Sequence, residues 1–248
     1  MNVKQIEDAT TALREVGEMR WGGKLRKLAE LSETSAKGKK VAQDYFFEFW
    51  CFIKAISAFK AIESTNAWKR AGPELDYAVW PLKPGDPENF SHYEFEYRDD
   101  VYCVHPGVSA TPHSYVGDYA PDISIRQSAL PESRGAVVAM WDAKYRATIT
   151  SRLARSEVLT FLTERELLIA DDPEDQALVD ELAKNAQEAF QLSGLLTNGD
   201  FSTEDGAFLK TKKIQEVKSF GTSNQQEKRN RDPSMEAPKS TATATNSA

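Results

Sequence analysis

The stretch VVAMWDAKYR, Val137 to Arg146, decides how the rest of the chain is interpreted. Its apolar and β-branched residues predict a buried β-strand. Side chains two positions apart point to the same face of a strand, so Asp142 and Lys144 are expected side by side. They form either a solvated strand end or a catalytic pair. The residues expected on the opposite face are Trp141, Ala143 and Tyr145.

A second acid precedes this strand. The segment YAPDISI predicts a short strand that begins near Pro121, because proline is tolerated at a strand start. Nineteen residues, Ile123 to Trp141, separate Asp122 from Asp142. A turn at PESRG, residues 131–135, folds the two strands together, so Asp122 can approach the face that carries Asp142.

Two carboxylates and a lysine at one point of a sheet suit phosphate chemistry. A divalent cation relieves the repulsion between the carboxylates, and oxygen ligands favour Mg²⁺ or Mn²⁺. An ammonium group there can hold a water molecule or stabilise charge that develops on a phosphate.

Pro121-Asp122 followed by Asp142-Ala143-Lys144 resembles the signature of PD-(D/E)XK nucleases, which have the restriction-endonuclease-like fold. The resemblance implies that Asp122 and Asp142 bind the metal, helped by the Ala143 backbone carbonyl, and that Lys144 orients and activates water. The implied fold is α/β (α+β), with a central mixed sheet flanked by helices and extra helices at the N-terminus.

The resemblance spans about residues 43–220 and has further parts. DAKYR after an apolar strand is similar to the form found in nucleases of restriction and phage defence. The segment from Leu195 to Val217 resembles the last strand, helix and strand of Mrr-like restriction nucleases. One departure is the segment 150–191, which is longer and more acidic than the single helix that the resemblance implies.

A glutamate on a helix before the sheet is common in this superfamily, and Glu48 lies in the predicted helix 43–62. At about 100° per residue, Ser57 lies opposite Glu48, so the acid falls on the apolar face of the helix. A buried acid needs a partner or a metal. The alternative is a glutamate at a frayed helix end, beside Lys40 and Asp44.

The remaining pattern predicts one α+β domain. Helices are expected before residue 34, a polar linker over SETSAKGKK, a hairpin around Asp99-Asp100, and helices over 152–170 and from Asp171 or Asp172 to about 192. We divide the chain into an N-terminal helical extension, 1–36, a nuclease-like domain, 37–220, and a disordered tail, 221–248.

Composition narrows the class of protein. The chain has 248 residues and a formal charge of −7, which argues against indiscriminate coating of nucleic acid. No membrane span or signal peptide is evident, so we expect a cytoplasmic protein. Cys51 and Cys103 are expected as buried free thiols, with a single bridge as the alternative.

Several basic residues are candidates for phosphate contact, with a solvated surface as the alternative for each. Arg146, Arg152 and Arg155 follow the predicted site. The clusters elsewhere are Lys37, Lys39 and Lys40, and Lys210, Lys212 and Lys213. The histidines, His92, His105 and His113, have no metal-ligand spacing.

The expected function is metal-dependent hydrolysis of DNA phosphodiester bonds in restriction or phage defence, with Asp122, Asp142, Lys144 and Glu48 as the catalytic residues. Glu48 is expected to complete the shell of the metal or to support a second metal. The alternatives are a repair or recombination nuclease, a catalytically silent nucleic-acid-binding module, and an interaction protein with an accidental match. A homodimer would address both DNA strands, and a motor or recognition subunit could be a separate chain.

Overall fold

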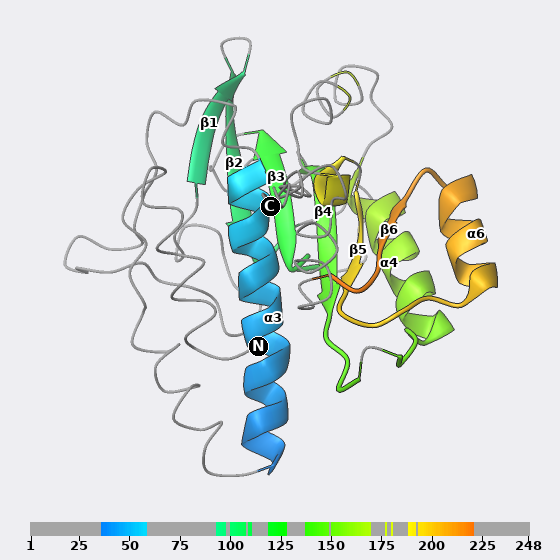
Figure 1. The fold of residues 1–248 in the computed structure, drawn as a ribbon. Coiled ribbons are helices and arrows are strands. Elements are labelled where there is room, and N and C mark those ends of the chain that lie inside the picture. Colours follow the sequence, from blue (N-terminus) through cyan, green and yellow to red (C-terminus); the bar gives the residue numbers. More distant parts are fainter. Residues whose placement is uncertain are drawn as a thin grey trace, which may run out of the picture.

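The computed structural model describes residues 36–58, 93–97, 100–107, 109–110, 119–127, 137–148, 150–169, 177, 180, 188–191 and 193–220. In these residues a mixed β-sheet carries helices on both faces, as Figure 1 shows. The predicted α+β architecture is therefore confirmed. The helices predicted before residue 34 and the tail 221–248 lie outside the described residues, as does most of the second helix predicted after Asp171.

The sheet has six strands in the order β1-β2-β3-β4-β5-β6. The first four form an antiparallel meander, and β5 and β6 run parallel to β4. The parallel strands need crossover connections, and α4 and α6 lie in those connections. The strands are β1 Tyr93–Tyr97, β2 Asp100–Pro106, β3 Ile123–Gln127, β4 Val137–Lys144, β5 Gly194–Thr197 and β6 Gln215–Val217.

The helices are α3 Ala36–Ala58, α4 Arg155–Leu168 and α6 Thr203–Thr211, with a short 3₁₀ turn, η5, at Glu188–Phe190. The helix predicted over 43–62 is thus confirmed in position but starts earlier. The prediction of a polar linker was wrong for residues 36–40, which are helical. Alanine and lysine are strong helix formers, so a polar composition alone did not exclude a helix there.

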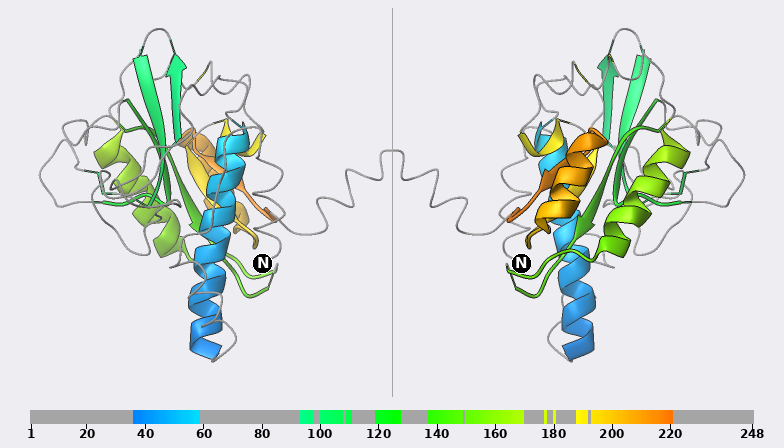
Figure 2. Two further views of the ribbon diagram at one scale, coloured as in Figure 1. Left: turned by 90° about the vertical axis from the view of Figure 1, so that its left-hand side faces the viewer. Right: turned by 90° about the vertical axis from the view of Figure 1, so that its right-hand side faces the viewer.

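Alternation along the strands divides the apolar residues between two cores. On one face, α3 packs over Trp141, Ala143 and Leu196. On the other face, α4 and α6 pack over Met140 and Leu195. Figure 2 shows α3 on one side of the sheet and α4 on the other. The two layers leave the carboxyl end of β4 between α3 and the start of α4.

None of the helices in the described part of the chain is long and apolar enough to cross a membrane. Cys51 and Cys103 are both free and buried, which confirms the expected pair of thiols over the single bridge.

Candidate active site at the end of β4

Strand register brings the two predicted acids together. Ile123 at the start of β3 pairs with Trp141 in β4, and the strands are antiparallel. The next pair outward along this register is Asp122 with Asp142. The turn predicted at PESRG, residues 131–135, lies outside the described residues, but the register of β3 and β4 brings the two acids together as the sequence predicts.

Lys144 lies between the two carboxylates. Its Nζ is 2.5 Å from Oδ2 of Asp142 and 3.9 Å from Oδ2 of Asp122. Asp142 and Lys144 therefore share one face of β4, as predicted. Trp141 and Ala143 belong to the core beneath α3, and Tyr145 packs against it, which confirms their place on the opposite face. The lysine side chain keeps 28% of its surface exposed, so the trio is accessible from solvent.

The backbone fixes Asp122 as well. The Ala143 N–H donates a 2.7 Å hydrogen bond to Oδ2 of Asp122. Burial raises the pKa of Asp122 well above its ordinary value, and the nearby charges of Asp142 and Glu48 raise it further. A hydrogen bond with Asp142 acts in the same direction, whereas Lys144 opposes it. Both carboxylates crowd one point and would gain from added positive charge.

The same charges hold Lys144 in its ammonium form. Burial acts to lower its pKa, but Asp122 and Asp142 outweigh burial, and the pKa of Lys144 is raised above its ordinary value. Lys144 therefore acts as a cation and hydrogen-bond donor over the physiological pH range. In this arrangement it can orient a water molecule or a phosphate oxygen, and it cannot take up a proton.

Glu48 approaches the same point from α3. It lies in the middle of that helix and is half-buried, so the alternative of a frayed helix end was wrong. Burial raises its pKa to about 7; Lys144 lowers the value, and Asp142 and Asp44 raise it. The charge of Glu48 therefore interacts with those of Lys144 and Asp142.

A cavity of about 700 Å³ opens beside these groups, between α3 and the end of β4. Charged side chains of both signs and one aromatic ring contribute to its wall, so it suits a polar ligand that carries charge. Its lining residues are Gln43, Asp44, Glu48, Ala143, Lys144, Tyr145, Arg146, Ala147, Ser151 and Glu157.

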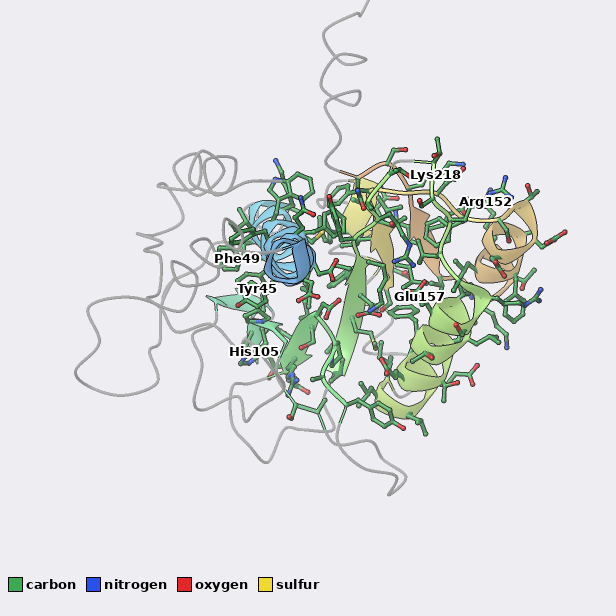
Figure 3. All side chains as sticks on the ribbon, turned by 90° about the horizontal axis from the view of Figure 1, so that it is seen from below. Tyr45, Phe49, His105, Arg152, Glu157 and Lys218 are labelled. Atoms are coloured by element: carbon green, nitrogen blue, oxygen red, sulfur yellow. The ribbon has the colours of Figure 1, made fainter. Side chains whose placement is uncertain are left out.

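Of the three predicted DNA-contacting arginines, only Arg146 lines this cavity. Its guanidinium forms an ion pair with Glu157 at the start of α4. Figure 3 labels Glu157, which lies on the side of α4 that faces the sheet. Arg155 is largely exposed, and its Nε lies 3.8 Å from Oδ1 of Asp205. Arg152 is exposed and pairs through its backbone with Asp200.

The predicted basic cluster near the end of α6 does not line the cavity. Lys210, Lys212 and Lys213 are exposed at the end of α6 and just beyond it. The Lys212 Nζ lies 3.6 Å from Oε1 of Glu166 on α4, an arrangement typical of a solvated surface. Lys37, Lys39 and Lys40 fall in the first turns of α3, where the side chains are not described.

Two acids of α4 were not predicted as site residues. Glu157 holds Arg146, and its Oε2 also accepts a 2.8 Å hydrogen bond from the Ala154 backbone N–H. Glu164 lies on the same side of α4, two turns after Glu157, and its charge interacts with those of Asp142 and Lys144. Burial and Asp142 raise the pKa of Glu164, whereas Lys144 lowers it. The spacing of seven residues, about two helical turns, between these acids was the available signal.

The carboxylates at this point suit a hard divalent cation. Mg²⁺ is bound in proteins through one or two carboxylates together with water and substrate phosphates, so Asp122 and Asp142 are a sufficient protein donor set. No group of three or more acidic, histidine or cysteine side chains fit to hold a metal occurs among the described residues. Glu48 lines the cavity, and its charge interacts with that of Asp142.

One of the three histidines is among the described residues, and it does not line the cavity. His105 is buried in β2, and neither His92 nor His113 is among the described residues. The chain matches no protein-family model, no curated protein and no solved structure, so its own geometry carries the interpretation of the site.

Proposed function

We propose that this protein is a metal-dependent nuclease that hydrolyses phosphodiester bonds in DNA. The observation that carries the proposal is the convergence of Asp122 and Asp142, from two neighbouring strands, on the Lys144 ammonium. Crowded carboxylates beside a cationic donor suit an attack on a phosphate. The order helix, antiparallel meander, helix and parallel strand supports a restriction-endonuclease-like core, as the resemblance to PD-(D/E)XK nucleases implies.

Each side chain then has a stated task. Asp122 and Asp142 would hold Mg²⁺ or Mn²⁺, with the Ala143 carbonyl as a backbone donor. A cation bound there would neutralise charge on the phosphate and lower the pKa of a bound water. Lys144 orients the attacking water and donates to the phosphate, while Arg146 reaches a phosphate from the cavity wall. Glu48 completes the acidic side of the cavity.

The biological setting is part of the proposal and rests on the resemblance alone. A cytoplasmic enzyme of restriction or phage defence is our first choice, and a repair or recombination nuclease is the alternative. Cleavage of both strands of a duplex would be achieved by a homodimer. A separate motor or recognition subunit would supply target choice.

The second candidate is a nucleic-acid-binding module without activity. The ion pairs of Lys144 favour it, because they already neutralise part of the carboxylate charge without any metal. Such a module would bind DNA equally well with and without a divalent cation. A nuclease would need the cation for turnover.

The deciding experiment is a cleavage assay on supercoiled plasmid, linear duplex, single-stranded, branched and methylated DNA, and RNA. Each substrate is incubated with Mg²⁺, with Mn²⁺ and with EDTA. The proposal expects cleavage of at least one DNA substrate that EDTA abolishes. Binding of DNA without cleavage of any substrate would favour the silent module, and neither binding nor cleavage would reject both.

A further inference from the structure

A four-residue segment at the end of β5, Thr197 to Asp200, contacts the chain on both sides of the cavity wall. The wall is formed in part by the loop that follows β4, which includes Tyr145, Arg146 and Ser151. In the parallel pairing of β4 and β5, Lys144 and Thr197 are the last partners. Beyond this pair, side-chain hydrogen bonds from the segment hold the backbone of the chain that follows β4.

Thr197 holds the peptide that carries Lys144. Its hydroxyl donates a 2.7 Å hydrogen bond to the Lys144 carbonyl and accepts a 3.0 Å bond from the Gly199 N–H. Thr197 is fully buried. A hydroxyl oxygen can donate one hydrogen bond and accept another at the same time, which valine at this position could not do.

Asn198 holds the next peptides. Its Oδ1 accepts a 2.6 Å hydrogen bond from the Arg146 N–H, and its Nδ2 donates a 2.7 Å bond to the Arg146 carbonyl. A primary amide reproduces the donor and acceptor of a backbone peptide, so the side chain extends the β4–β5 ladder past its last pair. The Arg146 guanidinium is held separately by Glu157.

The segment also holds the far end of the loop. The Asp200 N–H donates to the Ser151 carbonyl, and the Leu153 N–H donates to the Asp200 carbonyl, both at 3.0 Å. A Cβ at Gly199 would overlap the Ser151 carbonyl oxygen and lie 2.8 Å from Cγ of Arg146. The close approach explains a glycine at this position.

We propose that Thr197 and Asn198 are positioning residues of the site. They fix the peptides of Lys144 and Arg146 so that both cationic side chains stay at the cavity when a DNA phosphate binds. This inference rests on the proposed nuclease function. The inference adds two residues that align the Lys144 and Arg146 side chains toward a phosphate. Thr197 and Asn198 themselves would touch neither metal nor substrate.

The test uses matched substitutions in the full chain. Thr197→Val removes the hydroxyl at nearly constant shape, and Thr197→Ser retains it. Asn198→Ala removes both hydrogen bonds to Arg146, and Asn198→Asp keeps the acceptor alone. The control is Thr211→Val at the end of α6, where an exposed hydroxyl donates to the Phe208 carbonyl.

The first measurement is amide hydrogen exchange at Arg146 by NMR, which needs no activity. Protection should be lost in Asn198→Ala and retained in Asn198→Asp and in the control. Unchanged protection in Asn198→Ala would show that the Asn198 side chain does not hold the Arg146 peptide.

The second measurement is cleavage at saturating substrate with Mg²⁺. Misplacement of reacting groups by about 1 Å costs roughly 100-fold in rate, so kcat should fall roughly 10- to 100-fold in Thr197→Val and Asn198→Ala. KM should change less, and Thr197→Ser and the control should retain the wild-type kcat. Should Asn198→Ala fail to fold, the two Thr197 variants decide the question.

Failure of the proposed nuclease function can be distinguished from failure of the positioning role. If the wild-type protein cleaves no substrate, the proposed function is wrong. The exchange data would still show whether Asn198 holds the Arg146 peptide. Active wild-type protein together with folded Thr197→Val and Asn198→Ala of undiminished kcat rejects the positioning role alone.

Discussion

The backbone N–H of Ala143 donates a 2.7 Å hydrogen bond to Oδ2 of Asp122. The middle residue of the Asp-Ala-Lys triplet thus holds the acid that precedes the neighbouring strand, and the Lys144 ammonium lies near both that acid and Asp142. This hydrogen bond explains why Pro121-Asp122 and Asp142-Ala143-Lys144 lie side by side in the folded chain. A shift of one residue in the β3–β4 register would break this bond and turn Asp142 and Lys144 away from Asp122.

Removal of one negative charge at the site should abolish activity and preserve the fold. Asp122→Asn and Asp142→Asn keep the shape, and in Asp122→Asn the new side-chain amide oxygen can still accept from the Ala143 N–H. We expect cleavage to fall by roughly 100-fold or more, since loss of even an outer partner of a metal ligand costs 10- to 100-fold. The melting temperature without metal should stay level or rise, because repulsion is relieved.

The control for this pair is Asp100→Asn, which changes an exposed acid at the start of β2. Asp122→Ala is a poorer test than the sequence suggests. It leaves the partly buried Ala143 N–H without its acceptor, which costs about 1–3 kcal/mol of unfolding free energy. Full activity in Asp122→Asn or Asp142→Asn would remove that residue from the site.

Two substitutions of Lys144 separate charge from geometry. Lys144→Met removes the cation between the carboxylates and should lower both activity and, by about 1–3 kcal/mol, the free energy of unfolding at pH 7. Lys144→Arg keeps the charge but presents a planar fork, so stability should be retained while activity falls. Urea unfolding and the plasmid assay measure the two effects. Activity retained in Lys144→Met would exclude its proposed role.

The site residues that the sequence predicted share a local signal. An apolar strand with acid and base two positions apart fixes which side chains share a face, and the turn predicted at PESRG pairs this strand with the one that follows Pro121. The closeness of Asp122, Asp142 and Lys144 follows from these rules, whereas their roles at a metal site come from the resemblance to PD-(D/E)XK nucleases. Glu48 was proposed from the resemblance, and helix periodicity placed it on the apolar face of the predicted helix.

The residues that the sequence did not predict act across long separations. Asn198 contacts Arg146 fifty-two positions away, and no local pattern distinguishes this asparagine from one in an ordinary turn. Glu157 and Glu164 look like solvated helix acids until the packing of α4 on β4 is known. The early start of α3 was missed because a polar stretch was interpreted as a linker.

Thiol chemistry tests how α3 packs on the sheet. Cys51 in α3 and Cys103 in β2 are free and fully buried. Burial raises the pKa of Cys51, and the charges of Asp122 and Glu48 raise it further, so its reactive thiolate is scarce. Ellman's reagent should label neither thiol in the native protein and both in denaturant. Rapid labelling of one thiol in folded protein would contradict the packing of α3.

The pH dependence of stability tests the environment of Glu48. Its pKa is raised from an ordinary 4.5 to about 7, so the folded state binds more protons than the unfolded state between these values. The free energy of unfolding must therefore decrease as the pH rises through this window. Glu48→Gln cannot titrate and avoids this loss.

We expect Glu48→Gln and wild type to have similar stability at pH 4.5, with the variant gaining an advantage as the pH approaches 8. At about 1.4 kcal/mol per pKa unit the advantage is at most about 3 kcal/mol, and solvent access to this half-buried group reduces it. Urea unfolding at four pH values measures it, with Glu166→Gln as the exposed control. The rate of DNA cleavage should fall severalfold in Glu48→Gln and stay at the wild-type level in Glu166→Gln. A stability difference that does not change with pH would place Glu48 in contact with solvent, away from the Asp122–Asp142 pair.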